Sequence, residues 1–170
     1  MKKKEDNPLF DKQIQKILNK LISEEVIANQ FYIGCTAAAC KCQKALFNDM
    51  FVEIAIDELD DHCKNLCEWA KNNDYSVPFK FKDYEKYAAS SVVKQFENLK
   101  EDQEASYYVA EALKSEDDAI NSYQEAMEYD NLPQDLNAIL IQNYYDELEH
   151  KENLETLKMA VDGQIDLVNW

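Results

Sequence analysis

Glycine and proline are almost absent from this sequence, with two glycines and three prolines in 170 residues. These residues mark most of the turns in β-sheet folds, so their scarcity disfavours β-sheets and favours long helices. No Gly-rich loop of the kind that cradles phosphate groups is available. A chain of this length with 46% hydrophobic residues is predicted to form a single domain with one core, spanning residues 1–170.

Positive charge is also scarce, because Lys and Arg together number 18 against 34 acidic residues, and the net charge is −16. Nucleic acids and anionic membranes are bound by concentrated Lys or Arg, so neither partner is expected. The basic start, residues 1–4, is interpreted as a solvated terminus. It is not a signal peptide, because acidic residues and Pro8 follow it, and no apolar run approaches the length of a membrane span. We expect a cytoplasmic protein.

Cysteine pairs of the C-x-x-C type are absent. The five cysteines all lie in the first half of the chain, at Cys35, Cys40, Cys42, Cys63 and Cys67. An odd number without such a pair argues against a disulfide framework and against a structural zinc site. Reduced thiols in or beside a helical core are expected. Cys63 and Cys67 share a helix face beside a histidine, which leaves a redox or accessory metal role open.

Histidine occurs only twice, and both histidines have nearly identical surroundings. The segment DELDDH ends at His62 and the segment DELEH ends at His150. A second repeated pair precedes them, a glutamate followed seven residues later by a tyrosine, at Glu25 and Tyr32 and again at Glu116 and Tyr123. The chain therefore contains one two-helix unit twice, with Glu and Tyr on one helix and Glu and His on the next.

Four carboxylates and two imidazoles are the ligand set of a carboxylate-bridged two-metal centre in a four-helix bundle. The candidate ligands are Glu25, Glu58, His62, Glu116, Glu147 and His150. Each carboxylate occupies a position where the helical pattern calls for a core residue. An isolated buried carboxylate costs several kcal/mol, whereas two divalent cations would cancel four negative charges. Without metal, some of these carboxylates are expected to hold protons and to titrate together.

The two Glu and His pairs differ in spacing, because His62 follows Glu58 by four residues and His150 follows Glu147 by three. Both spacings place the two side chains on one helix face. A single π-turn, which often occurs at functional sites, would absorb the extra residue. Alternatively, the first half-site has looser geometry, and the two metal positions differ in affinity.

Apolar residues recur every three or four positions in four long segments. This pattern predicts helices over residues 9–44, 46–72, 103–130 and 133–162, the last ended by Gly163. The long connection between the second and third helices carries a further helical pattern over residues 83–99. Such a crossover lets the second pair of helices run the other way, as in ferritin-like topology. We predict an all-α ferritin-like four-helix bundle whose long crossover carries a short extra helix.

The motifs resemble the ferritin-like superfamily over almost the whole chain. The segment EVIANQFY, residues 25–32, resembles the first-helix signature of ferritins and bacterioferritins, and the Glu147 and His150 pair resembles the second half of a bacterioferritin centre. The longer spacing of Glu58 and His62 is closer to the Dps-like ferritins called thioferritins. The resemblance implies two terminal, two bridging and two imidazole ligands, respectively Glu25 and Glu116, Glu58 and Glu147, and His62 and His150.

The resemblance implies a di-iron ferroxidase and iron-storage protein, active against oxidative stress, that oxidises ferrous iron with oxygen or peroxide. It also implies a closed homo-oligomeric shell, with twelve subunits preferred to twenty-four. Two iron ions per subunit are expected, with manganese as the other candidate, and no methionine stands out as a haem ligand, so no haem is expected. Tyr32 and Tyr123 either hydrogen-bond a ligand glutamate or supply a transient electron, or they only pack.

Two other functions stay open. A non-storage di-metal enzyme, such as a peroxidase or a manganese catalase-like protein, would use the same ligands, since these suit iron and manganese alike. A structural bundle with a degenerate site is the third hypothesis. It is favoured by the unequal Glu and His spacings and by the lack of the cysteine pair that thioferritins carry near the third helix and crossover.

Overall fold

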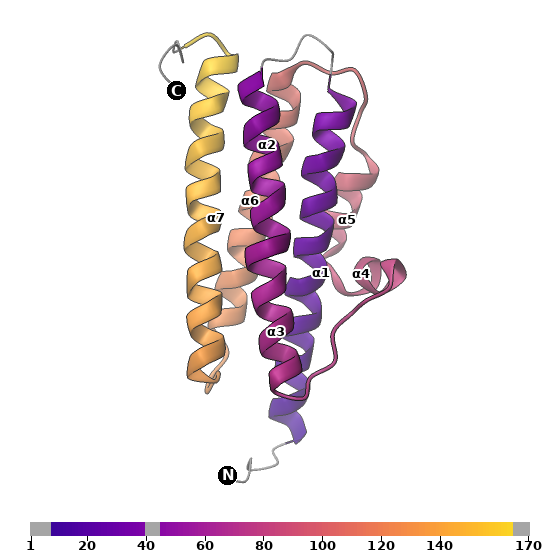
Figure 1. Ribbon diagram of the computed structural model, residues 1–170, viewed down its shortest axis with the longest axis vertical. Coiled ribbons are helices and arrows are strands. Elements are labelled where there is room, and N and C mark those ends of the chain that lie inside the picture. The colour runs from indigo at the N-terminus through magenta and orange to yellow at the C-terminus, as the bar shows by residue number, and fades with distance from the viewer. Residues whose placement is uncertain (1–7, 40–44, 165–170) are drawn as a thin grey trace.

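The computed structural model describes residues 8–39 and 45–164, and its long helices form a four-helix bundle (Figure 1). The first, third and fourth long helices are α1 (Pro8–Ala38), α6 (Ala105–Met127) and α7 (Gln134–Val161). The second long helix is continuous through three segments, α2 (Ala45–Asp57), η1 (Glu58–Cys63) and α3 (Lys64–Asn72). The predicted all-α bundle is confirmed. The basic start at residues 1–4, Cys40, Cys42 and residues 165–170 lie outside the described residues.

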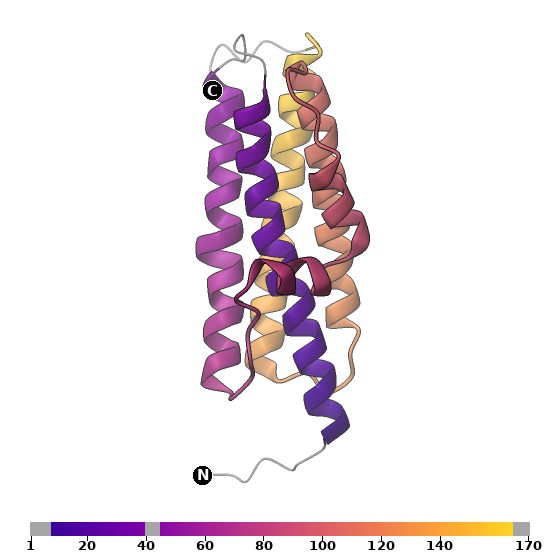
Figure 2. The ribbon, with the colours of Figure 1, turned by 90° about the vertical axis from the view of Figure 1, so that its right-hand side faces the viewer.

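The chain crosses from one end of the bundle to the other between the two helix pairs. α1 and α7 run toward one end, and the second long helix and α6 run toward the other (Figure 1). The crossover carries α4 (Phe81–Tyr87) and α5 (Ser90–Glu97). In Figure 2, α4 lies across α1, and α5 climbs beside α6. Within the described ranges, no helix is both long and apolar enough to cross a membrane.

The predicted crossover helix over residues 83–99 is divided in the structure into two short helices, α4 and α5. The helix is interrupted at Ala88 and Ala89, whose backbone is extended with ψ angles of 156° and 142°. Alanine is the strongest helix former, so local propensity does not explain the break. The N–H of Ala89 donates a 2.9 Å hydrogen bond to the carboxylate of Glu24 on α1. This tertiary contact holds the start of α5 against α1.

The first helix is shorter than predicted, because α1 ends at Ala38 and not at residue 44; residues 40–44 lie outside the described chain. The carbonyl of Ala38 accepts hydrogen bonds from the N–H of Asp102 at 2.8 Å and from the hydroxyl of Tyr108 at 2.7 Å. The last carbonyls of a helix need donors from elsewhere. Groups at the end of the crossover and on α6 supply them here.

The last helix ends next to Gly163, as predicted. Gly163 has a φ angle of 72°, a left-handed conformation that glycine adopts without steric cost. The N–H groups of Gly163 and Gln164 donate to the carbonyls of Ala160 at 3.1 Å and Met159 at 2.8 Å. These two bonds form a Schellman motif, which satisfies the final carbonyls of α7.

The core of the bundle consists of two apolar clusters, one toward each end, with a polar layer between them. All four long helices contribute to both clusters. The first includes Leu18, Leu21, Leu66, Ala126, Leu136 and Leu140. The second includes Phe31, Phe47, Phe51, Tyr108, Leu154 and Leu157. The polar layer lies midway along the bundle, where helices distant in sequence present buried charged side chains to one another.

Candidate metal centre

The six candidate ligands meet in the polar layer. They come from all four long helices, with Glu25 on α1, Glu58 and His62 on η1, Glu116 on α6, and Glu147 and His150 on α7. None of them is more than 6% exposed. The structure therefore brings together every residue that the repeated sequence motifs singled out as a candidate ligand.

The six residues form two overlapping groups. In one group, Glu25, Glu58, His62 and Glu147 each offer one ligand atom, and these atoms all lie within 4.8 Å of one another. The second group meets the same limit and consists of Glu58, Glu116, Glu147 and His150. Glu58 and Glu147 belong to both groups, so two cations held here would share these two carboxylates.

The imidazole of His62 faces three carboxylates of the first group. Its Nδ1 lies 3.3 Å from Oε1 of Glu147, 3.4 Å from Oε2 of Glu25 and 3.8 Å from Oε2 of Glu58. Its other nitrogen, Nε2, lies 3.6 Å from Oδ2 of Asp146. One edge of the ring therefore points into the layer, and the other points toward a carboxylate outside it.

His150 has the same arrangement in the second group. Its Nδ1 lies 3.7 Å from Oε2 of Glu116, 3.7 Å from Oε2 of Glu147 and 3.9 Å from Oε1 of Glu58. Its Nε2 lies 3.4 Å from Oδ2 of Asp57. The two half-sites are therefore related by an approximate two-fold repeat, as the duplicated motifs indicate.

A π-helix carries the first Glu and His pair. The segment η1 spans Glu58–Cys63, and its wider turn takes up the extra residue between Glu58 and His62. Of the two alternatives that the four-residue spacing left open, the structure shows the π-turn. The alternative of a looser first half-site finds no support, since both groups bring four ligand atoms within the same 4.8 Å.

Two tyrosines hold the glutamates that belong to one group only. The hydroxyl of Tyr32 on α1 donates to Glu116 on α6, and the hydroxyl of Tyr123 on α6 donates to Glu25 on α1. The amide of Asn143 donates in turn to the Tyr123 hydroxyl at 2.9 Å. Burial and the nearby carboxylates raise the pKa of both tyrosines well above the ordinary value. Both hydroxyls therefore keep their protons and act as donors, a role beyond packing.

Burial of these acids changes their protonation. Burial raises the pKa of Glu58 and Glu116 well above the ordinary range, and the charge of Glu147 adds to the shift. Burial acts on Glu147 in the same direction, but the facing rings of His150 and His62 outweigh it and lower its pKa to about 2. Burial lowers the pKa of His62, and the carboxylates around it outweigh this and raise it. Without metal, the layer thus holds extra protons, as the sequence predicted.

Many oxygen and nitrogen atoms that could bind a metal in this layer lack a hydrogen-bond partner among the described residues. They are one carboxylate oxygen each of Glu25, Glu58 and Glu116, both oxygens of Glu147, both ring nitrogens of His62, and Nδ1 of His150. Leaving a buried polar group unsatisfied costs about 1–3 kcal/mol, and native proteins rarely do so. Divalent iron or manganese, which accept oxygen and imidazole ligands, would satisfy all of these atoms except Nε2 of His62, which faces Asp146 outside the layer.

The thiols lie in or against the apolar clusters, Cys35 in the second and Cys63 and Cys67 at the first. Cys35, Cys63 and Cys67 are free, as predicted for the cysteines that fall within the described ranges. The Sγ atoms of Cys63 and Cys67 are 4.0 Å apart, and the hydrogen bond between the two thiols lowers the pKa of Cys67 to about 7. Neither ligand group includes a cysteine, so the geometry gives no support to an accessory metal role for them.

Two residues of the site were missed by sequence reasoning, Asp57 and Asp146. Each directly precedes a shared glutamate, and each faces the histidine of the opposite repeat. A carboxylate against the outer nitrogen of a ligand histidine fixes the ring and its tautomer. The repetition that identified the other site residues includes these two, since both DEL segments begin with the same aspartate.

Replacing Asp57 or Asp146 with asparagine should weaken metal binding by roughly 10–100-fold while leaving the bundle folded, because such partners set the orientation and basicity of histidine ligands. Calorimetric titration of the metal-free protein with Mn²⁺ measures the change. Asp61→Asn, at an exposed position of η1, is the matched control. Affinities equal to that of the control would show that the two aspartates do not support the histidines.

No protein-family model matches this sequence, and no curated protein matches it. Among solved structures, the chain is similar to the bacterioferritin-related protein from Bacteroides fragilis, which is described as a dodecameric thioferritin. The TM-score is 0.75 at 20% identity, and the match covers 90% of this chain and 88% of that one. This likeness establishes a ferritin-like fold, as the motif resemblance predicted.

Proposed function

We propose that this protein is a di-iron ferroxidase that stores the ferric product inside a shell of identical subunits. The observation that carries the proposal is the pair of buried ligand groups that share Glu58 and Glu147. A ferritin-like fold and a layer of buried donor atoms without hydrogen-bond partners support it.

The six residues would divide the work of binding two ferrous ions. Glu58 and Glu147 would bridge the ions, and each ion would also bind a terminal glutamate and an imidazole, from Glu25 and His62 or from Glu116 and His150. Bridging carboxylates hold two metals about 3.5–4 Å apart. Two ferrous ions at this separation can together reduce oxygen to hydrogen peroxide, or peroxide to two waters. Paired transfer avoids the release of one-electron oxygen radicals.

The chain around the ligands would keep this chemistry contained. Tyr32 and Tyr123 hold the two terminal glutamates by hydrogen bonds, so these carboxylates keep their orientation as iron arrives and leaves. The apolar clusters on both sides of the layer exclude water, and electrostatic interactions in such a site are stronger than in water. Oriented ligands and the exclusion of water would together limit side reactions of the bound ferrous ions.

An apolar stripe on the second long helix supports assembly from identical copies. Val52, Ile56 and Leu59 follow one another at spacings of four and three residues, and each side chain is about half exposed. Large apolar side chains grouped on an outer surface are typical of interaction sites. The similar protein from Bacteroides fragilis is a dodecamer, which favours twelve subunits for the proposed shell.

Aerobic addition of excess ferrous iron should give tens of iron atoms per chain, on a size-exclusion peak far larger than a monomer. Iron and protein measured across that peak give the ratio. About two irons per chain would keep the di-iron centre but contradict storage, in favour of a non-storage enzyme. No bound iron would contradict the whole proposal and favour a structural bundle.

A further inference from the structure

A further carboxylate, that of Glu24, is buried beside the candidate centre. Glu24 precedes Glu25 on α1 and is 6% exposed. Its Oε1 accepts the Ala89 N–H at 2.9 Å, whereas Oε2 is buried without a hydrogen bond of normal geometry, with the Ser122 side chain close to the carboxylate. The contact with Ala89 therefore accounts for only one of the two oxygens. A neutral glutamine would make that contact as well, without burying a charge.

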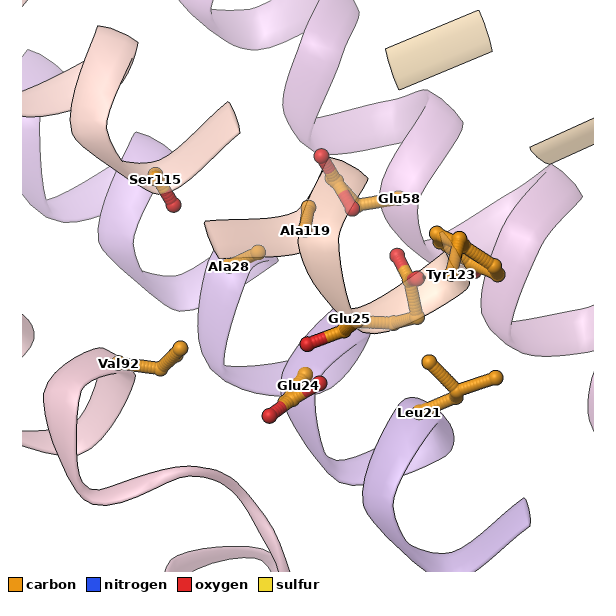
Figure 3. Close-up of a pocket in the computed structure, with 10 residues that line it drawn as sticks. Leu21, Glu24, Glu25, Ala28, Glu58, Val92, Ser115, Ala119 and Tyr123 are labelled. Atoms are coloured by element: carbon orange, nitrogen blue, oxygen red, sulfur yellow. Dashed lines mark hydrogen bonds between the residues drawn. The ribbon is translucent and has the colours of Figure 1, made fainter. Parts of the chain in front are cut away.

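Glu24 lines a small inner pocket between α1 and α6, beneath α5. The pocket has a volume of about 10 Å³, close to the space of one water molecule. Figure 3 shows Glu24 beside Glu25, with Glu58 beyond it and Val92 of α5 on the other side. The carboxylate of Glu24 thus lies on the wall of a pocket that is also lined by two of the candidate ligands.

A second, outer pocket borders the inner one. Its volume is about 160 Å³, and it shares Leu21 and Ser122 with the inner pocket. Its walls include Lys20 and Glu125, whose side chains form a 2.8 Å ion pair at the surface. The two pockets follow the seam between α1 and α6, with Glu24 at the inner one.

We propose that Glu24 is a transient binding site for divalent cations, through which they pass from the outer pocket to the candidate centre. This inference rests on the proposed function, since it requires a centre that takes up metal. A cation that leaves water needs a compensating charge at each step, because an unpaired charge in an apolar interior is costly. Oε2 of Glu24 supplies that charge before the cation reaches Glu25, and the Ser122 hydroxyl lines both pockets as a further oxygen ligand.

Glu24→Gln separates this role from a structural one, because the amide oxygen still accepts the Ala89 N–H while the charge is lost. Stopped-flow mixing of metal-free protein with Co²⁺ reports filling of the centre through the visible absorption of the bound ion. We expect Glu24→Gln to fill at least about tenfold more slowly, in line with the effect of local charge on association rates, and to reach the wild-type final absorbance. Glu149→Gln, at an exposed position, should fill at the wild-type rate.

Ala119→Leu tests the route without changing any charge, since Ala119 lines the inner pocket and a larger side chain would narrow it. We expect slow filling here too, with an unchanged end point. Filling of Glu24→Gln at the wild-type rate would overturn the role of Glu24, and wild-type filling of both variants would overturn the route. Absence of Co²⁺ binding by the wild-type protein would contradict the proposed function itself.

Discussion

Replacing either Glu58 or Glu147 with alanine should abolish rapid ferrous oxidation. Both residues belong to both ligand groups, so a single substitution removes a ligand from each of the two metal positions. Loss of an outer partner of a metal ligand already costs 10–100-fold. Loss of a shared ligand should therefore slow the rapid phase by more than about 100-fold.

The terminal glutamates should behave differently, and this contrast tests the bridging assignment. Glu25 and Glu116 each belong to one group, so Glu25→Ala or Glu116→Ala leaves one complete position. Such variants should bind one metal ion per chain in calorimetric titration, whereas the Glu58 and Glu147 variants should lose tight binding at both positions. Equal stoichiometry in all four variants would contradict the division into bridging and terminal ligands.

The rate of ferrous oxidation by the Glu58 and Glu147 variants is measured as oxygen consumption after addition of about two ferrous ions per chain. Glu149→Ala is the matched control, because Glu149 lies on α7 between Glu147 and His150 but is exposed, and it should oxidise iron at the wild-type rate. Circular dichroism verifies that each variant is helical. If folded Glu58→Ala and Glu147→Ala both keep the wild-type rate, the ligand assignment is wrong.

The meeting of the six candidate ligands in one buried layer was predictable from the sequence because core positions and repetition coincide there. A glutamate in a core position is costly, and the same departure from the apolar pattern recurs in each long helix. The spacing of Glu58 and His62 differed from that of the second copy and left two alternatives, a π-turn or a looser half-site, between which the structure decides for the π-turn. Internal duplication thus replaced the information that related sequences would otherwise supply.

The features that escaped prediction depend on contacts between segments distant in the sequence. The break before α5 is held by a hydrogen bond from Ala89 to Glu24, and the end of α1 is held by Asp102 and Tyr108. No proline or glycine marks either helix boundary, so the apolar pattern predicted that each helix would continue past it. Only the three-dimensional arrangement supplies the partner that makes each helix end.

The pairing of Asp57 and Asp146 with the histidines was not predicted from the sequence, for the same reason. The sequence shows that Asp57 precedes Glu58 and that Asp146 precedes Glu147. It does not show that each aspartate faces the ring of the opposite repeat, His150 for Asp57 and His62 for Asp146. The packing of the helices determines that each aspartate faces the histidine of the other repeat and not that of its own.

Metal should reverse the order of stability between the wild-type protein and a Glu58→Gln variant. Without metal the wild-type protein holds a buried carboxyl whose pKa is raised well above the ordinary value by burial and by the charges of Glu147 and Glu25. A raised carboxyl pKa makes the folded state lose stability as pH rises from the ordinary value of 4.5 toward neutrality, because unfolding releases a proton that folding must take up. Glutamine removes this cost.

At pH 7 without metal, Glu58→Gln should therefore unfold with a free energy up to about 3 kcal/mol higher than the wild-type protein, because taking up a proton on folding costs about 1.4 kcal/mol for each pH unit above 4.5. At pH 4 the difference should shrink, since Glu58 is then protonated in the unfolded chain as well. Urea titrations of the chelated proteins at the two pH values measure both quantities. A variant less stable than the wild-type protein at pH 7 would contradict the burial cost assigned to Glu58.

With metal the order should invert. A ligand at a thousand times its dissociation constant stabilises the folded state by about 4 kcal/mol, which for a chain of this length raises the melting temperature by about 8–16 °C. The wild-type protein should show this rise with Mn²⁺, and Glu58→Gln should show little of it, because the variant lacks a ligand common to both positions. Equal shifts in the two proteins would mean that the metal stabilises the fold from elsewhere. A crossing of the two stabilities would show that the buried carboxyl group of Glu58 serves metal binding at the expense of the stability of the metal-free fold.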